Sequence, residues 1–148
     1  ATTFKAKLAE EGIIFMSYEQ IKQLKARYFR YVDTHQFDAL EDVFAKDAKL
    51  QWGPEDDQAF VGREVIIASL EANLKDATTI HHGHMPEIEL IDDDHARGIW
   101  AMNDVVDHPD YLLVGVGHYH EDYVREDGVW KVARMQLTRL REERTPKS

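Results

Sequence analysis

Three histidines lie close together in the stretch TTIHHGH, residues 78–84 of a chain with eight histidines and no cysteine. Histidine can transfer protons near neutral pH, because its unperturbed pKa is about 6.5, and it is also a common metal ligand. In a strand, His81 and His82 would face opposite sides, since successive residues alternate. His84 returns to the His81 face only if Gly83 does not break the alternation. The residues alone leave open a metal site, a catalytic base or plain strand histidines.

Two other polar residues stand where they could assist a base. Tyr28 lies on the apolar side of a predicted helix, so its phenol should point inward and could donate to a substrate carbonyl. Asp104 shares a predicted strand face with Trp100 and Met102. We expect this apolar setting to raise the pKa of its carboxyl group and leave it a neutral donor.

A second histidine pair stands two residues apart, as His118 and His120. In a strand these share a face, which is the geometry of a His-x-His metal pair. No third ligand follows at a recognisable spacing. Tyr119 faces the other side, and the pattern leaves open which of the two faces points inward.

The bulk composition favours one ordinary soluble domain, residues 1–148. A net charge of −10 argues against a nucleic-acid or anionic membrane surface, because both need a basic patch. The absence of cysteine excludes disulfides, thiolate zinc sites and cysteine nucleophiles. The apolar run at residues 12–16 is too short for a signal-peptide core or a membrane span. We expect a cytoplasmic protein.

The first half of the chain has helical signals. Residues 17–20, Ser-Tyr-Glu-Gln, have the form of a capping box and predict a helix from there to about Asp33, with a weaker helix over residues 3–10. A short helix over residues 37–44 and a strand over residues 48–52 follow. Gly62 opens a third predicted helix.

From Thr79 onward the hydrophobic period changes to two, which predicts an antiparallel meander. Its last three strands, over residues 96–107, 111–125 and 129–140, are long enough that the sheet must curve or bulge. Helices first and strands after give an α+β domain with helices packed on one face of a curved sheet. Such a cone has an interior that could bind a ligand. The charged residues 139–144 are interpreted as a solvated end of the chain.

Four segments resemble, in order and spacing, the SnoaL-like branch of the NTF2-like cone-shaped α+β barrels. This branch includes scytalone dehydratase, hexachlorocyclohexane dehydrochlorinase and the bile-acid dehydratases. The resemblance covers about residues 21–142. The matching segments are IKQLKARYFRYVD (21–33), IHHGHMPEIEL (80–90), GIWAMND (98–104) and DGVWK (127–131).

The resemblance implies a catalytic dyad of Asp33 with His81. It places Tyr28 and Asp104 at the positions of further active-site residues. A pocket tyrosine of these relatives falls on Trp52, whose indole N–H donates a hydrogen bond but cannot exchange a proton as a phenol does. We also expect a homo-oligomer, with a trimer favoured over a dimer.

These residues predict a cofactor-independent dehydratase that eliminates water beta to a carbonyl of a cyclic or polycyclic hydroxyketone. His81 is the expected base and acid, and Asp33 orients it. Trp52, Met102 and Tyr119 are the expected substrate-binding residues, for a hydrophobic ring.

Two alternatives remain. One is a non-catalytic module of the same fold that binds a small molecule or supports a larger enzyme. The other is a metal enzyme built on His118 and His120.

Overall fold

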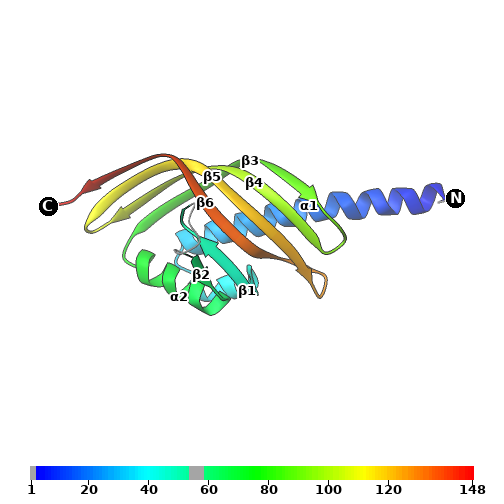
Figure 1. Cartoon of the computed structure of the whole chain (residues 1–148), viewed down its shortest axis with the longest axis horizontal. Coiled ribbons are helices and arrows are strands. Elements are labelled where there is room, and N and C mark those ends of the chain that lie inside the picture. Colours follow the sequence, from blue (N-terminus) through cyan, green and yellow to red (C-terminus); the bar gives the residue numbers. More distant parts are fainter. Residues whose placement is uncertain (1–2, 54–58) are drawn as a thin grey trace.

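A computed structural model describes residues 3–53 and 59–148 of the chain. In the described part of the chain, two helices and a short 3₁₀ helix lie on one side of a sheet of six strands (Figure 1). The elements are α1 (Phe4–Asp33), η1 (Phe37–Asp42), β1 (Phe44–Gln51), β2 (Ala59–Val61), α2 (Arg63–Leu74), β3 (Thr78–Leu90), β4 (His95–His108), β5 (Tyr111–Glu126) and β6 (Val129–Pro146).

The strand order is β2-β1-β6-β5-β4-β3, and every neighbouring pair is antiparallel except β1 with β6. The long strands arch over the C-terminal half of α1 and over α2 (Figure 1). The α+β fold with helices on one face of a curved, mainly antiparallel sheet is therefore confirmed.

Alternating burial along the strands shows which face looks inward. On β5, Leu113 and Tyr119 are buried, whereas Leu112 and Val114, which point to the opposite face of the strand, are exposed. Tyr119 therefore belongs to the inner face, and the neighbouring histidines belong to the outer face. This decides the point that the sequence pattern left open.

The long strands curve with the help of bulges, as their length required. On β6, Val116 of β5 pairs with Arg141 and Gly117 pairs with Arg139, so Leu140 is an extra residue without a partner of its own. A bulge of this kind turns the following side chains to the other face.

The start of α1 differs from the prediction. The helix begins after Thr3, whose hydroxyl caps it by accepting from the Ala6 N–H at 3.2 Å, and it continues unbroken to Asp33. The predicted cap at Ser17 is wrong: Ser17 is a buried residue within the helix. No glycine turn or proline interrupts the chain before it, so the two predicted helices are one.

The N-terminal part of α1 projects from the body (Figure 1). It leaves large apolar side chains exposed, namely Phe4, Leu8, Ile13, Ile14, Phe15 and Met16. No helix in the described part of the chain is both long and apolar enough to cross a membrane.

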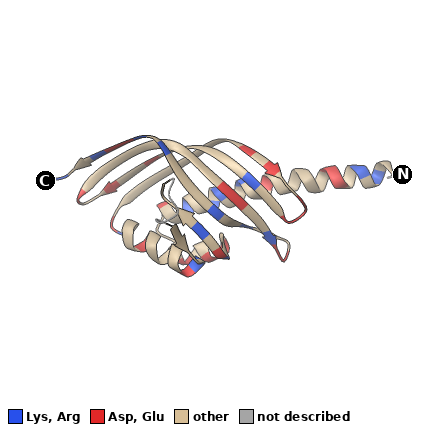
Figure 2. Cartoon of the chain, viewed as in Figure 1, with Lys and Arg blue, Asp and Glu red and all other residues tan. Residues whose placement is uncertain are grey.

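Two smaller boundaries also differ. Phe44 begins β1 instead of ending a helix, because η1 stops at Asp42. β6 extends to Pro146, beyond the predicted end at residue 140. Figure 2 shows basic and acidic residues interspersed along α1 and the sheet, so the net negative charge is not gathered on one element.

Candidate active site

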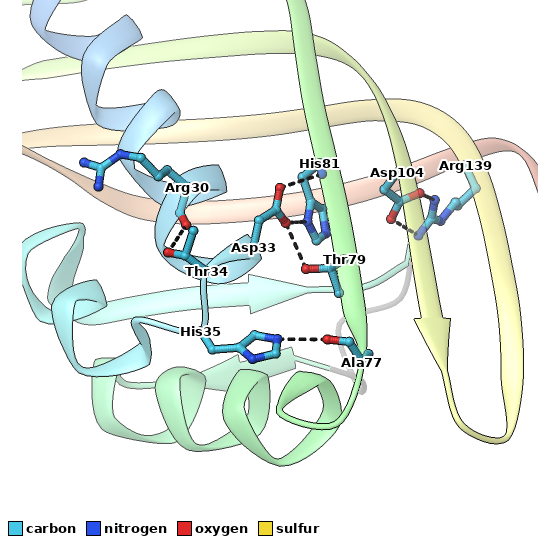
Figure 3. Close-up of polar contacts among 9 residues, drawn as sticks. All are labelled: Arg30, Asp33, Thr34, His35, Ala77, Thr79, His81, Asp104 and Arg139. Carbon is cyan, nitrogen blue, oxygen red and sulfur yellow. Dashed lines mark hydrogen bonds and ion pairs between the residues drawn. The ribbon is translucent and has the colours of Figure 1, made fainter.

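The end of α1 delivers Asp33 to the inner face of β3 (Figure 3). The Nδ1–H of His81 donates to Asp33 Oδ1 at 2.6 Å, and the His81 backbone N–H donates to Oδ2 at 2.9 Å. The Thr79 hydroxyl also donates to Oδ1, at 2.9 Å. One carboxylate thus holds both the backbone and the ring of His81.

The turn after α1 is tied to the same strand. His35 adopts a left-handed backbone conformation with φ of 56°, which ends the helix, and its ring N–H donates to the Ala77 carbonyl at 2.8 Å. Ala77, Thr79 and His81 alternate along the chain and are all buried. They therefore present one strand face to the helix end, as Figure 3 shows.

Electrostatics favour an ionised Asp33 carboxylate facing the Nδ1–H of His81. Burial acts to raise the pKa of Asp33, but the hydrogen bonds from the His81 ring, the His81 backbone and Thr79 hold that pKa below its ordinary value of 3.8. An ionised carboxylate only accepts, so Nδ1 must carry the proton. The other ring nitrogen, Nε2, is then free to act as a base.

His81 forms part of the wall of a cavity of about 380 Å³. This volume lies within the range of small-molecule sites. Trp52, directly after β1, also lines it, and the remaining polar groups come from α2, β4, β5 and β6. The apolar lining residues are Phe60, Leu70, Leu74, Val106, Leu113 and Leu137.

Asp104 on β4 pairs with His81 on β3. The surroundings of Asp104 are polar, contrary to the apolar setting that the sequence predicted. The Arg139 guanidinium forms two hydrogen bonds with the Asp104 carboxylate, at 2.5 and 2.9 Å (Figure 3). Such a fork pairs with an ionised carboxylate, so the prediction of a neutral Asp104 donor is wrong. Burial acts to lower the pKa of Arg139, but the hydrogen bonds and charge of Asp104 raise it.

Two features of the sheet make room for this ion pair. A Cβ at Gly115 would collide with the Arg139 guanidinium and the Asp104 carboxylate. The bulge at Leu140 lets both Arg139 and Glu142 face the cavity although they stand three residues apart. The interpretation of this charged segment as a solvated end of the chain is therefore wrong for Arg139, whereas residues 140–144 are exposed.

A family model for the SnoaL-like domain matches residues 16–136 of the chain. This match covers most of the chain and includes Asp33, His81 and Asp104. The chain belongs to the SnoaL-like family.

Solved structures agree with this fold. The SnoaL-like chain is similar to a proposed scytalone dehydratase from Novosphingobium aromaticivorans, with a TM-score of 0.82, 18% identity and 90% of each chain covered. It is similar to the hexachlorocyclohexane dehydrochlorinase LinA type 2, at 0.78 and 21% with 93% of each chain covered. An NTF2-like protein with a cystatin-like fold from N. aromaticivorans gives 0.78 and 17%, with 93% and 90% covered. The distant relatives of this SnoaL-like domain thus include dehydratases and dehydrochlorinases.

Three of the expected site residues lie in the core of the SnoaL-like domain and not among the cavity-lining residues. Tyr28, Met102 and Tyr119 are at most 3% exposed. The Tyr28 and Tyr119 rings meet edge to face, with centroids 6.3 Å apart. Burial raises the pKa of both phenols well above the ordinary value. Of the three expected substrate-binding residues, only Trp52 lines the cavity.

Four other histidines that the sequence singled out make no contact with Asp33 or His81 among those that the structure shows. His82 and His84 are exposed, and the His84 ring contacts Asn103 Oδ1 at 2.7 Å. His118 and His120 lie on the outer face, where His120 contacts the Thr138 hydroxyl at 3.2 Å. Within residues 3–53 and 59–148, no three His, Cys, Asp or Glu side chains come together as a metal site would require.

A buried ion pair was missed entirely. Lys25 on α1 donates to Glu121 on β5 at 2.9 Å, and both side chains are almost fully buried. Glu121 also accepts from the Tyr123 hydroxyl at 2.8 Å, and Tyr123 accepts from the Trp100 indole at 2.9 Å. Burial lowers the pKa of Lys25 to about 8, against the opposing effect of Glu121. Only Lys25 in a mainly apolar helix face signalled this pair, because its partner is distant in sequence.

Proposed function

We propose that the protein is a cofactor-independent lyase that eliminates water beta to the carbonyl of a cyclic hydroxyketone. The observation that carries this proposal is the 2.6 Å contact between Asp33 and His81 Nδ1 at the wall of the cavity. A non-catalytic binding module needs neither the ionised Asp33 nor the ring that it orients.

In the proposed reaction, His81 Nε2 takes the proton from the carbon next to the carbonyl. The C–H electrons form an enolate, and the negative charge moves to the carbonyl oxygen. As the enolate collapses to a carbon–carbon double bond, the beta hydroxyl group leaves and takes the proton back from the imidazolium as water. Asp33 stabilises the imidazolium between these two steps.

Arg139 is the group that we assign to the enolate oxygen. A guanidinium has five N–H donors, and two of its nitrogens are engaged by Asp104. The remaining donors can reach a substrate oxygen in the cavity that Arg139 lines. This assignment gives Arg139 the role expected of Tyr28, which lies deeper in the core. Asp104 then keeps Arg139 charged and in place.

The cavity lining supports a hydrophobic ring as the substrate. Most of its side chains are aliphatic or aromatic, and the indole of Trp52 offers a flat surface. The polar groups of His81 and Arg139 would align one oxygenated edge of the ring. A halide on the same carbon could leave by the same proton abstraction, as the similarity to a dehydrochlorinase invites.

The test is a panel of cyclic beta-hydroxyketones assayed for the ultraviolet absorbance of the conjugated enone. We expect turnover by the native protein and loss of turnover in His81→Ala and Asp33→Asn. If the native protein binds such compounds in the cavity but releases them unchanged, the lyase proposal is wrong and the protein is a binding module.

We also propose that the domain self-associates through the outer face of the sheet. Apolar side chains exposed there are Ile80, Ile99, Leu112, Val114 and Val116. Burial of such a patch favours association. Sedimentation equilibrium should give a trimer mass, and a monomer at all concentrations would contradict this.

A further inference from the structure

Phe29 packs its ring against the imidazole of His81. The two ring centroids are 6.1 Å apart, and the planes differ by 11°. Phe29 stands one helical turn before Asp33, so both side chains leave the same side of α1. The catalytic ring therefore meets α1 twice, once at its edge through the Asp33 carboxylate and once at its face through Phe29.

Gly83 provides the space for this arrangement. A Cβ at residue 83 would lie 2.7 Å from Phe29 Cε2 and 3.2 Å from Trp100 Cε3. The backbone does not require glycine, because the glycines with positive φ in the described chain are Gly62 and Gly128. Close approach is thus the reason for a glycine between the histidines of the HHGH stretch.

The hydrogen bond from Asp33 does not by itself define the ring plane. Torsion about the Cβ–Cγ bond of histidine has a broad energy minimum, so the ring can swing about its tether at Nδ1. Such a swing moves Nε2, the atom that must come within roughly 2.6–3.2 Å of the proton it takes. A rigid neighbour parallel to the ring limits the swing.

The ring of Phe29 is itself held in place. It is 9% exposed and contacts the rings of Tyr28 and Tyr119 at centroid distances of 5.6 and 5.8 Å. The Lys25 ammonium lies 4.8 Å from its centroid. These contacts restrict the motion of the Phe29 ring, so that it can limit the motion of the imidazole.

We propose that Phe29 is a positioning residue that holds the His81 imidazole in the plane needed for proton transfer, and that Gly83 is the glycine that admits it. The inference rests on the proposed function for its effect on rate. The orientation of the ring, however, can be measured without any substrate.

The first experiment compares native protein with Phe29→Leu by nitrogen-15 NMR of the His81 ring. Native protein should show one tautomer with the proton on Nδ1. Phe29→Leu should keep this tautomer, which the Asp33 carboxylate sets, but should show His81 ring signals that are broadened by motion of the ring. With a substrate that the native protein converts, the kcat of Phe29→Leu should be about 10- to 100-fold lower and KM nearly unchanged, because a misplaced base slows the chemical step.

The matched control is Phe37→Leu. Phe37 stacks on His35 with a centroid distance of 5.6 Å and an interplanar angle of 14°, and neither ring lines the cavity with His81. Phe37→Leu removes the same kind of ring contact from a buried residue that does not touch His81. It should therefore leave the His81 signals and kcat unchanged. Equal His81 spectra in Phe29→Leu and Phe37→Leu would overturn the inference.

Gly83→Ala attacks the same contact from the other side and carries the test if Phe29→Leu does not fold. It should displace the Phe29 ring, and so broaden the His81 signals and lower the thermal midpoint. Adding Phe29→Leu removes the nearest atoms that the new methyl group meets, those of the Phe29 ring, so the double variant should lose less stability than the sum of the two. Strict additivity would count against the shared contact.

The two proposals fail in different ways. Absence of turnover on every hydroxyketone, with the His81 ring signals still broadened in Phe29→Leu, would remove the lyase and keep the positioning role of Phe29. Turnover with an unchanged kcat in Phe29→Leu would keep the lyase and remove the positioning.

Discussion

The protein contains two polar clusters that look alike in chemistry and differ in access. The cavity cluster consists of Asp33, His81, Asp104 and Arg139, and His81, Asp104 and Arg139 line the cavity. The core network consists of Lys25, Glu121, Tyr123 and Trp100, all buried and absent from the cavity lining.

Access decides what each cluster can do. A group that meets a ligand can gain interactions in a transition state, whereas a sealed group interacts only with the fold. The sealed pair sits between α1 and β5 and tethers the helix that carries Asp33. Mutations in the cavity cluster should therefore change rates, and mutations in the core network should change stability.

His81→Ala should have the largest effect, a fall in kcat of about 100- to 10,000-fold, because it removes the proposed general acid and base. The control is His84→Ala, which removes an exposed histidine of the same stretch. Steady-state kinetics on a turned-over hydroxyketone measures both. A similar loss in both variants would show that the stretch acts through the fold.

Lys25→Met should lower the free energy of unfolding by about 3–5 kcal/mol, because it leaves the buried Glu121 carboxylate without its partner. Urea unfolding followed by tryptophan fluorescence measures this. The control is Lys22→Met, which breaks an exposed pair with Glu19 of 3.1 Å and should cost less than about 1 kcal/mol. Equal losses would contradict the sealed character of the pair.

Arg139→Met combined with Asp104→Asn should lower kcat about 100- to 1,000-fold, the effect of removing one donor to a developing oxyanion. Changing both residues avoids an unpaired buried carboxylate, so the thermal midpoint should remain near that of the native chain. Kinetics together with thermal unfolding checks this. Full activity in the double variant would assign the enolate oxygen to another group.

Lys25→Met combined with Glu121→Gln should recover most of the stability lost by Lys25→Met alone, to within about 2 kcal/mol of the native chain. Both buried charges are gone, and the glutamine still offers an oxygen to the Tyr123 hydroxyl. The same urea experiment measures the recovery. A double variant as unstable as Lys25→Met would mean that the ion pair itself contributes the stability.

Asp33→Asn should have the smallest effect on the free energy of unfolding. The effect should be visible in how that free energy depends on pH. The folded pKa of Asp33 lies below the ordinary 3.8, so its contribution to stability is present above that value and is lost as pH falls through the folded pKa. The native chain should therefore lose more stability between about pH 7 and pH 3 than Asp33→Asn does.

The control is Asp92→Asn, which removes an exposed carboxylate that contacts His95 at 2.8 Å. Its pKa is also lowered, by hydrogen bonds from the Asp94 backbone and the His95 ring. Solvent screens this exposed pair, so its variant should follow the pH dependence of the native chain. If the pH dependence of unfolding in Asp33→Asn coincides with that of the native chain and of Asp92→Asn, the contact between Asp33 and His81 does not stabilise the fold.

The sequence by itself determined that helices come first and long strands after, and its resemblance to a family predicted the pairing of Asp33 with His81; the short strand β2 was not predicted. Hydrophobic period gave the helices and long strands, because burial of one face is a local property of the chain. The resemblance of short segments then identified the dyad, and the structure brings the two residues together. The capping box at Ser17 misled, because a local cap signal does not break a helix whose preceding residues also favour one.

Only the tertiary structure decided which polar groups face the cavity. Glu142 enters it because a bulge at Leu140 shifts the register of β6 after Arg139, and a shift of one residue exchanges the two faces of a strand. Lys25 finds Glu121, and Phe29 finds Gly83, across distances in sequence that no local pattern spans. Tyr28, Met102 and Tyr119 share the inner surface but lie too deep to line the cavity. The period of an element predicts which of its sides is buried, whereas curvature and register, which arise from the packing of all strands together, determine where a cavity opens.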